Sequence, residues 1–203
     1  MPHTAPMKGR YCTVTPLDPK VHGDSLYQVF SAASNESDWT YLPYGPFQER
    51  SSFNDWLSGD CSGQDPLFYV VIDNQNGEAV GLASYLRIEP AVGVIEVGHI
   101  HFSPTLQKTP TATEAMYLMM SHVFDDLGYR RYEWKCDAFN DRSKRAAARL
   151  GFGFEGVFRQ ATLYKGRNRD TAWFSILDSE WPRQKAAFER WLQPSNFDSR
   201  GAQ

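Results

Sequence analysis

The stretch that decides the fold is Val94-Ile95-Glu96-Val97-Gly98-His99-Ile100-His101-Phe102, an apolar and β-branched run typical of a strand. From Thr113 onward, apolar residues recur with the 3.6-residue period of a helix, and Gly128 stands where a left-handed residue would end it. A second strand pattern follows over residues 132–137. Strand, helix and strand in this order predict a parallel pair joined by a right-handed crossover.

The pattern before this unit predicts one strand, two helices and two more strands. We expect a strand over residues 10–17, a helix capped by Asp24, a helix from near Pro46 to just before Gly59, and strands over residues 67–73 and 79–88. Turn residues at 74–77 and 90–93 separate the last two strands from each other and from residues 94–102. These three strands are therefore expected to be antiparallel neighbours.

The pattern after this unit predicts a short helix and a closing hairpin. The helix covers residues 142–150, the hairpin strands cover 154–164 and 169–177, a last helix contains Phe188 and Trp191, and a polar tail occupies 194–203. The expected fold class is α/β with a mixed, mostly antiparallel sheet. We expect one domain over residues 1–203.

Composition narrows the classes of partner. A chain of 203 residues with 41% hydrophobic and 14% aromatic residues is suited to a single core. A net charge of -3 and a pI of about 5.9 argue against binding to nucleic acid. No apolar run has the length of a signal peptide or a membrane span, so we expect no membrane partner and a cytoplasmic location.

The three cysteines are Cys12, Cys61 and Cys136. They are odd in number and widely separated, and no two of them have the spacing of metal ligands. We expect reduced thiols and no metal site.

Two blocks of sequence resemble a known family. The first is Glu96-Val97-Gly98-His99-Ile100-His101-Phe102 followed by Leu106-Gln107-Lys108-Thr109-Pro110-Thr111-Ala112-Thr113-Glu114-Ala115. The second is Asn140-Asp141-Arg142-Ser143 followed by Arg149-Leu150-Gly151-Phe152. Together with the strand order, they resemble the GCN5-related N-acetyltransferase (GNAT) superfamily, and most of all its branch of ribosomal-protein N-terminal acetyltransferases.

The resemblance implies the GNAT fold, with its parallel strand pair splayed around acetyl-coenzyme A, and transfer of the acetyl group to a primary amine. It implies coenzyme contacts by the residues that match the family's motifs: Ile100, His101, Phe102, Gln107, Lys108, Thr109, Thr111, Ala112, Thr113, Asn140 and Ser143. Pro110 departs from the family, since a glycine whose N–H binds the coenzyme pyrophosphate usually stands there. Proline has no N–H to donate, and the neighbouring threonine hydroxyls are candidate replacements.

The loop before Thr113 also has a physical reason to bind an anion. The first N–H groups of a helix have no intrahelical partner and carry a partial positive charge, which favours phosphate. Lys108, Thr111 and Thr113 add donors. The alternative is a capped helix start with no ligand.

Four residues are candidates for the chemistry. In the resemblance, Glu96 stands in the Glu-x-Gly position of the branch and would be the general base or hold the amine. The residue that many members use as a tyrosine acid is Ala147 here, so Ser143 is the candidate proton donor to the thiolate. His99 and His101 share a strand face and are candidate proton relays. The alternatives are a charge on a solvated strand face for Glu96, two structural histidines, and a helix N-cap at residues 140–143.

The sequence does not identify the amine that accepts the acetyl group. Trp39 and Tyr41, from an aromatic loop rich in proline and glycine, and Glu96 are candidate acceptor contacts, although a structural aromatic cluster explains the first two equally well. The candidate acceptors are a protein N-terminus, a polyamine and a small amine metabolite. The alternative function is an acyl-coenzyme A-binding or protein-interaction module that has lost catalysis. A monomer and a homodimer are both compatible with the sequence.

Overall fold

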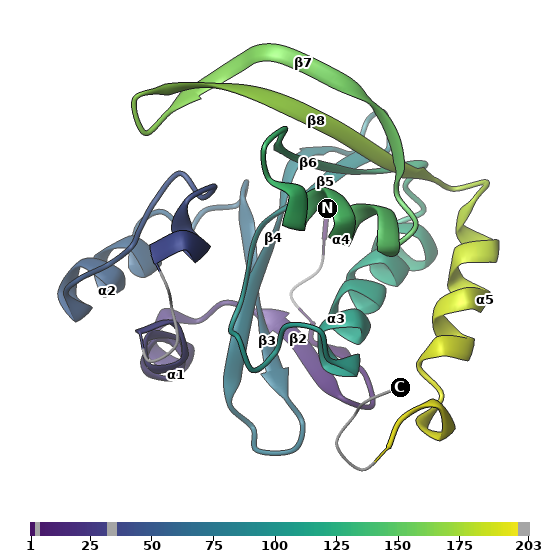
Figure 1. The fold of residues 1–203 in the computed structure, drawn as a ribbon. Helices are drawn as coiled ribbons and strands as arrows, with labels where there is room; N and C mark the ends of the chain where they lie inside the picture. The colour runs from purple at the N-terminus through teal and green to yellow at the C-terminus, as the bar shows by residue number, and fades with distance from the viewer. Residues whose placement is uncertain (3–4, 32–35, 199–203) are drawn as a thin grey trace.

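A curved eight-stranded sheet with helices on both faces forms the body of the computed structural model, which describes residues 1–2, 5–31 and 36–198 (Figure 1). The strand order is β1-β2-β3-β4-β5-β6-β8-β7. The strands are β1 Met7–Lys8, β2 Cys12–Pro16, β3 Leu67–Asp73, β4 Ala79–Glu89, β5 Val94–Phe102, β6 Arg131–Asp137, β7 Gly153–Tyr164 and β8 Arg167–Leu177.

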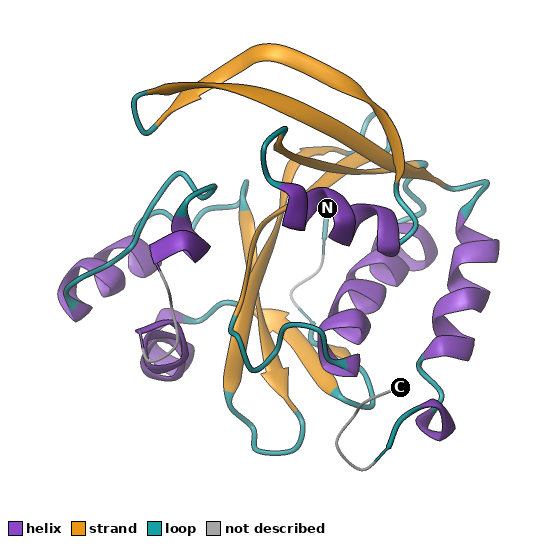
Figure 2. Cartoon of the chain, in the orientation of Figure 1, coloured by secondary structure: helices purple, strands orange, loops and turns teal. Residues whose placement is uncertain are grey.

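The helices divide between the two faces of the sheet (Figure 2). Helices α1 and α2 cover one face, and α3, α4 and α5 cover the other; we call these the α1 face and the α3 face. The α-helices are α1 Pro19–Ser31, α2 Arg50–Ser58, α3 Pro110–Ser121, α4 Asp141–Arg149 and α5 Trp181–Trp191. Shorter turns of helix occupy Glu36–Trp39, His122–Asp126 and Pro194–Asn196.

The predicted fold class is confirmed. Strands β3, β4 and β5 are antiparallel neighbours, and β5 and β6 form the parallel pair joined through α3. Gly128, after α3 and its last π-helical turn, has a φ of 63°, so the left-handed residue is where the sequence placed it. The parallel pair lies in an otherwise antiparallel sheet.

Three predicted boundaries are wrong, all at helix starts. Helix α1 begins at Pro19 and not at Asp24, because Asp18 accepts a hydrogen bond from the N–H of Lys20 and a proline is well suited to the first helical position. Helix α2 begins at Arg50, later than Pro46. Helix α3 begins at residue 110, earlier than Thr113.

The N-terminal strand is also different from its prediction. Residues 7–16 form a short hairpin of β1 and β2, and not one strand over 10–17. The buried carboxylate of Glu114 on α3 accepts hydrogen bonds from the N–H groups of Arg10, Tyr11 and Cys12 in this hairpin. A Cβ at Gly9 would lie 2.4 Å from Glu114 Cδ. Glu114 therefore fixes the hairpin to the start of α3.

Two buried clusters hold the layers together. The larger one joins the sheet to α3, α4 and α5 and contains Met116, Met119 and Met120. The smaller one joins the sheet to α1 and α2 and is mostly aromatic. Cys12, Cys61 and Cys136 are free and buried, and burial raises the pKa of each thiol.

The C-terminal segment makes aromatic contacts with the rest of the protein, which a purely polar tail would not make. Phe197 lies against Trp191, with ring centroids 4.9 Å apart, and against Tyr11 at 6.3 Å. Residues 199–203 of the predicted tail lie outside the described part of the chain. None of the helices in the described part has the length and apolar character needed to cross a membrane.

Candidate active site

The parallel pair separates part-way along its length. Its ladder runs from Val94 opposite Arg131 to Val97 opposite Trp134 and ends there. Strand β5 nevertheless continues to residue 102, still paired to β4, and β6 continues to residue 137, still paired to β8. The facing edges of residues 98–102 and 135–137 are therefore left without ladder partners. We call this opening the split.

A bulge in β5 shapes one side of the split. Gly98 pairs with Ser84 and His101 with Leu82, so two residues of β5 lie opposite one residue of β4. His99, within this bulge, has a φ of 50°, which is unusual for a residue with a side chain. A bulge of this kind changes the direction of side chains and N–H groups beside a site.

The bulge also decides which face each side chain joins. Ile100 and Phe102 pack against the cluster on the α3 face. His101 lies on the α1 face, where its ring is 4.1 Å from the centroids of both Phe30 and Trp39. The side chains predicted to contact the coenzyme in this stretch are thus divided between the two faces.

Helix α3 begins with an N-cap, Thr109, whose side chain bonds to the first turn. The Thr109 hydroxyl accepts from the N–H of Ala112 at 3.1 Å and donates to the carbonyl of Leu106 at 2.6 Å. Pro110 occupies the first or second helical position, where a missing N–H costs no intrahelical bond. The predicted alternative of a capped start is therefore present in the structure, and the hydroxyl proton of Thr109 is already donated to Leu106.

Several donors at this helix start nevertheless have no partner. Among the described residues, nothing accepts a hydrogen bond from the N–H groups of Lys108, Thr109 or Thr111, or from the Thr111 hydroxyl. Gln107 is exposed, and its side-chain amide donates to the carbonyl of Phe102 at 2.8 Å. Lys108 is exposed as well. Unpaired N–H groups at the positive end of a helix form an anion site.

A residue that was not among the candidate coenzyme contacts adds positive charge there. Arg149, at the end of α4, donates from Nη1 to the hydroxyl of Thr113 at 3.2 Å. That hydroxyl is in turn close to the carbonyl of Thr109, at 3.5 Å. No local pattern links residues 113 and 149, because the contact depends on how α4 packs against α3.

The start of α4 brings together the second block. Asn140 caps the helix by accepting from the N–H of Ser143 at 3.0 Å. The indole N–H of Trp134, in the last pair of the β5–β6 ladder, donates to Ser143 Oγ at 2.9 Å. Because an indole N–H only donates, Ser143 accepts this bond, and its hydroxyl also makes a hydrogen bond with the Cys136 thiol. Ser143 therefore lies beside the split on the α3 face.

Glu96 lies on the opposite face, within a chain of buried ion pairs. Its carboxylate is 2.8 Å from Lys135 Nζ and 2.9 Å from Arg87 Nη1, and its side chain is 4% exposed. Burial raises the pKa of Glu96, and the two cations oppose that shift. Lys135 also contacts Glu133 at 2.7 Å and lies 3.8 Å above the ring of Trp173. Glu96 is thus a partnered, buried carboxylate and not a charge on a solvated face.

The two histidines share one face, the α1 face, where both rings lie among aromatic side chains. His99 Nδ1 is 3.1 Å from the Tyr44 hydroxyl, and its ring stacks on that of Tyr44 at 5.6 Å. Burial lowers the pKa of both His99 and His101 to about 4. Both imidazoles are therefore neutral at pH 7.

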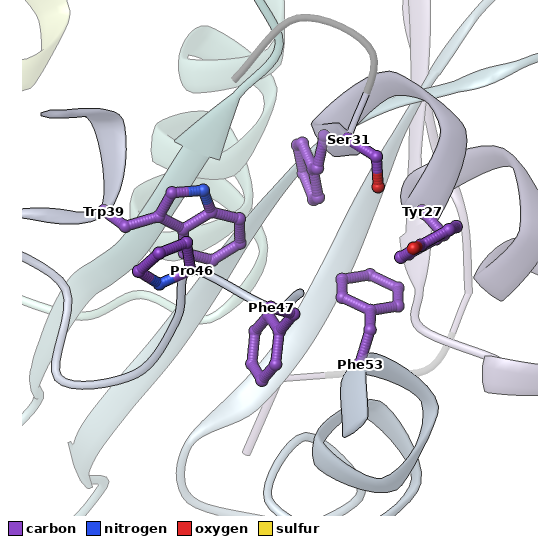
Figure 3. Close-up of a pocket in the computed structure, with 7 residues that line it drawn as sticks. Tyr27, Ser31, Trp39, Pro46, Phe47 and Phe53 are labelled. Atoms are coloured by element: carbon purple, nitrogen blue, oxygen red, sulfur yellow. The ribbon is translucent and has the colours of Figure 1, made fainter. Parts of the chain in front are cut away.

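The candidate acceptor contacts from the aromatic loop have different surroundings. Trp39 is 3% exposed and belongs to the aromatic cluster beneath α1 and α2. The cavity beside it, lined also by Tyr27, Phe47 and Phe53, holds about 20 Å³ (Figure 3). That is room for about one water molecule and not for an acceptor. Tyr41 is partly exposed and donates to the carbonyl of Phe139 at 3.0 Å.

The tip of the β7–β8 hairpin reaches the same loop, which the sequence did not indicate. The Lys165 ammonium donates to the carbonyls of Trp39 at 2.8 Å and Gly45 at 3.1 Å. On the neighbouring strand end, Asp137 holds Arg167 at 2.5 Å and the Tyr164 hydroxyl at 2.8 Å. The aromatic loop, the end of β6 and the tip of the β7–β8 hairpin are therefore joined to one another on the α1 face.

The fold is shared with known proteins. Residues 13–153 match the acetyltransferase (GNAT) domain. The chain belongs to this family. A solved GCN5-related N-acetyltransferase from Brucella melitensis is 50% identical, with a TM-score of 0.96 over 100% of this chain and 91% of that one. A ribosomal-protein-serine acetyltransferase of Escherichia coli is 29% identical over 51% of this chain and 58% of its own length.

A further GNAT relative extends the match. An uncharacterised N-acetyltransferase of Bacillus licheniformis is 27% identical over 70% of this chain and 80% of its own length. The resemblance to the family, and to a branch that includes a ribosomal-protein acetyltransferase, is thereby confirmed. This GNAT chain is an acyltransferase enzyme of a family that uses acetyl-coenzyme A.

Proposed function

We propose that the protein transfers an acetyl group from acetyl-coenzyme A to a primary amine by direct attack of the amine within the split. The observation that carries this proposal is the end of the β5–β6 ladder at Val97 and Trp134, with Ser143 on one face and Glu96 on the other. The thioester supplies an activated acetyl group. The thioester reaches the split from the α3 face and the amine from the α1 face.

The start of α3 fits the pyrophosphate of the coenzyme. Donors are present there even though Pro110 has no N–H. They are the unpaired N–H groups of Lys108, Thr109 and Thr111, the Lys108 ammonium and the Thr111 hydroxyl. Gln107, Ala112 and Thr113 complete the loop by holding its shape, because each is bonded within it. Arg149, on Thr113, adds a cation.

Ser143 is the proton donor to the departing thiolate. Its Oγ accepts from Trp134, and its hydroxyl, which is hydrogen-bonded to the Cys136 thiol in this structure, would turn to the coenzyme sulfur when the coenzyme is bound. Asn140 fixes the position of Ser143 through the helix cap and retains its side-chain amide for the coenzyme. The cap and the catalytic role are therefore compatible.

Glu96 is the carboxylate that holds or deprotonates the attacking amine. It lies one residue before the end of the ladder, on the face opposite Ser143, and is buried. Its two cationic partners favour the ionised form that either role requires. The neutral rings of His99 and His101 extend from it along the same face and remain candidate relays.

A catalytically inactive, coenzyme-binding protein is the second candidate, because Ala147 replaces the usual tyrosine and Pro110 the usual glycine. Release of free thiol from acetyl-coenzyme A, measured across N-terminal peptides, polyamines and small amines, separates the two. We expect release that depends on the amine and is lost in Ser143→Ala. Stabilisation by coenzyme A without release from any amine would support the inactive protein instead.

A further inference from the structure

Strand β4 contains a bulge close to Glu96. Leu86 pairs with Glu96, and beyond that pair two residues of β4, Arg87 and Ile88, lie opposite one residue of β5. Arg87 has a φ of 48°, in the left-handed region that glycine usually occupies at this position of a bulge. A residue with a side chain is strained in this conformation, and it persists there only where the surrounding structure holds it.

Asp65, in the loop before β3, holds this bulge in place. Its two carboxylate oxygens accept hydrogen bonds from the N–H of Arg87 at 2.8 Å and from the N–H of Ile88 at 3.0 Å. A bulge leaves backbone groups without a partner on the neighbouring strand, and here one carboxylate satisfies two of them. The loop before β3 therefore fixes the backbone of β4 at residues 87 and 88.

The bulge directs the Arg87 side chain to the α1 face. Leu86 lies opposite Glu96 and shares its face, so regular alternation would place residue 87 on the other face of the sheet. In the bulge it is Ile88 that packs against the cluster on the α3 face. Arg87 Nη1 lies 2.9 Å from Glu96 Oε2 on the α1 face. A largely exposed arginine thus places its charge on a buried carboxylate.

The charged groups that act on Glu96 come from two neighbouring strands in the described part of the chain. Arg87 reaches it from β4, and Lys135 and Glu133 act on it from β6. Lys135 is shared, because its ammonium also contacts Glu133 at 2.7 Å. On β5 itself, burial and the charge of Arg87 lower the pKa of His99 to about 4, so its ring is neutral. Within the described residues, Arg87 is thus the cation that pairs with Glu96 alone.

We propose that Arg87 and Asp65 are positioning residues for Glu96. Asp65 holds the bulge, the bulge directs the Arg87 guanidinium, and the guanidinium keeps the Glu96 carboxylate in place and ionised for the attacking amine. Neither residue needs to contact the amine or the coenzyme. This inference rests on the proposed acetyl transfer and adds two residues that act through Glu96.

The test compares kcat/KM of the unmodified protein with that of Arg87→Gln between pH 5 and pH 8, at saturating acetyl-coenzyme A. The acceptor is the amine that gives the fastest thiol release among N-terminal peptides, polyamines and small amines. The same acceptor is used for every variant, so the titration of its amine cancels in the ratio of the two kcat/KM values.

The ratio of unmodified protein to Arg87→Gln should depend on pH. Removing a cation beside Glu96 disfavours its ionised form, so the pKa of Glu96 rises and activity is lost at a higher pH. We expect a rise of about one pH unit, the lower end for a neighbouring opposite charge, because the Arg87 side chain is 57% exposed. The ratio should therefore increase toward about tenfold as the pH falls from 8 to 5.

Further variants locate the effect. Arg87→Lys keeps the charge and should restore most of the activity in acid. Asp65→Ala releases the bulge and should raise the ratio in acid by no more than Arg87→Gln does. Because Asp65 acts through Arg87, the double variant should behave like Arg87→Gln alone. Arg50→Gln, which removes a half-exposed arginine from its pair with Asp24, is the matched control, and its ratio should not depend on pH. Coenzyme A binding, measured at each pH, shows that the variants fold.

Three results would overturn different parts. A ratio for Arg87→Gln that does not change with pH, in protein that binds coenzyme A, makes Arg87 a structural residue and overturns the inference while acetyl transfer stands. A double variant that loses more activity in acid than Arg87→Gln overturns the role of Asp65. No thiol release with any acceptor, in unmodified protein that binds coenzyme A, overturns the proposed function and this inference with it.

Discussion

The two faces of the split are built from different kinds of contact. On the α3 face, Thr109 caps Ala112 and Asn140 caps Ser143, each across three residues of chain. On the α1 face, Glu96 contacts Lys135, and Lys165 contacts a carbonyl 126 positions away. The face assigned to the coenzyme is thus built around local helix caps, joined across helices by the contact of Arg149 with Thr113, whereas the face assigned to the acceptor is built around pairs between separate strands and loops. Changes on the α1 face should therefore affect stability more, and changes on the α3 face should affect turnover and coenzyme affinity more.

Lys135→Met is expected to give the largest effect. It leaves Glu96 and Glu133, whose side chains are 4% and 10% exposed, each without one of its cations. Removing one partner of a buried ion pair costs about 3 kcal/mol or more in the free energy of unfolding. Urea unfolding at pH 7 measures it. Lys144→Met, which removes a half-exposed pair with Asp141, is the control and should change stability by less than about 0.5 kcal/mol.

Ser143→Ala tests the α3 face. Loss of the proton donor should lower kcat by about a hundredfold, the lower end of the range for general acid catalysis, with coenzyme affinity nearly unchanged. Ser143→Thr keeps a hydroxyl and should recover most of the loss. A Ser143→Ala enzyme with normal kcat and weakened coenzyme binding would make Ser143 a binding residue only.

The buried His101 predicts a loss of stability in acid on the α1 face. Its pKa is lowered by burial to about 4, from 6.5, so the unfolded chain binds the proton more readily than the folded one. The stability it contributes is present above pH 6.5 and is lost as the pH falls toward 4, by about 2 kcal/mol at pH 5. In His101→Phe this part of the pH dependence should disappear, as urea unfolding at pH 7 and pH 5 would show. An unchanged pH dependence would contradict the assignment.

Pro110→Ala should produce the smallest effect, on the α3 face. Alanine keeps the helical conformation and adds one N–H at the start of α3, so coenzyme A should bind more tightly by about 1 kcal/mol, the net contribution of one hydrogen bond. Calorimetric titration with coenzyme A measures it. Weaker binding would show that the helix start with proline is itself the preferred anion site.

Sequence patterns predicted most elements and their order along the chain, because period and turn chemistry are local. They failed at the start of α1, where Asp24 was expected to cap the helix, although Pro19 fits a first helical turn. They failed as well at residues 7–16, since the hairpin there depends on Glu114, about a hundred positions later. Contacts of that range leave no periodic signal.

The candidate site was predicted to a similar extent. The residues of both motif blocks were named from the sequence, and Asn140 was named both as a cap and as a coenzyme contact. Lys135, Arg87, Arg149 and Lys165 were not among the candidate site residues, because each acquires its place only through a partner on another element.

The sequence by itself determined the parallel crossover, the presence of a helix after β5 and the family, since these follow from spacing along the chain. Only the tertiary structure decided the state of the side chains around the split: Glu96 paired, the histidines neutral, Trp39 buried and Arg87 directed to Glu96. Burial and charge pairing depend on which strands and helices meet. The chemistry of the acceptor side therefore follows from the folded structure and not from the sequence.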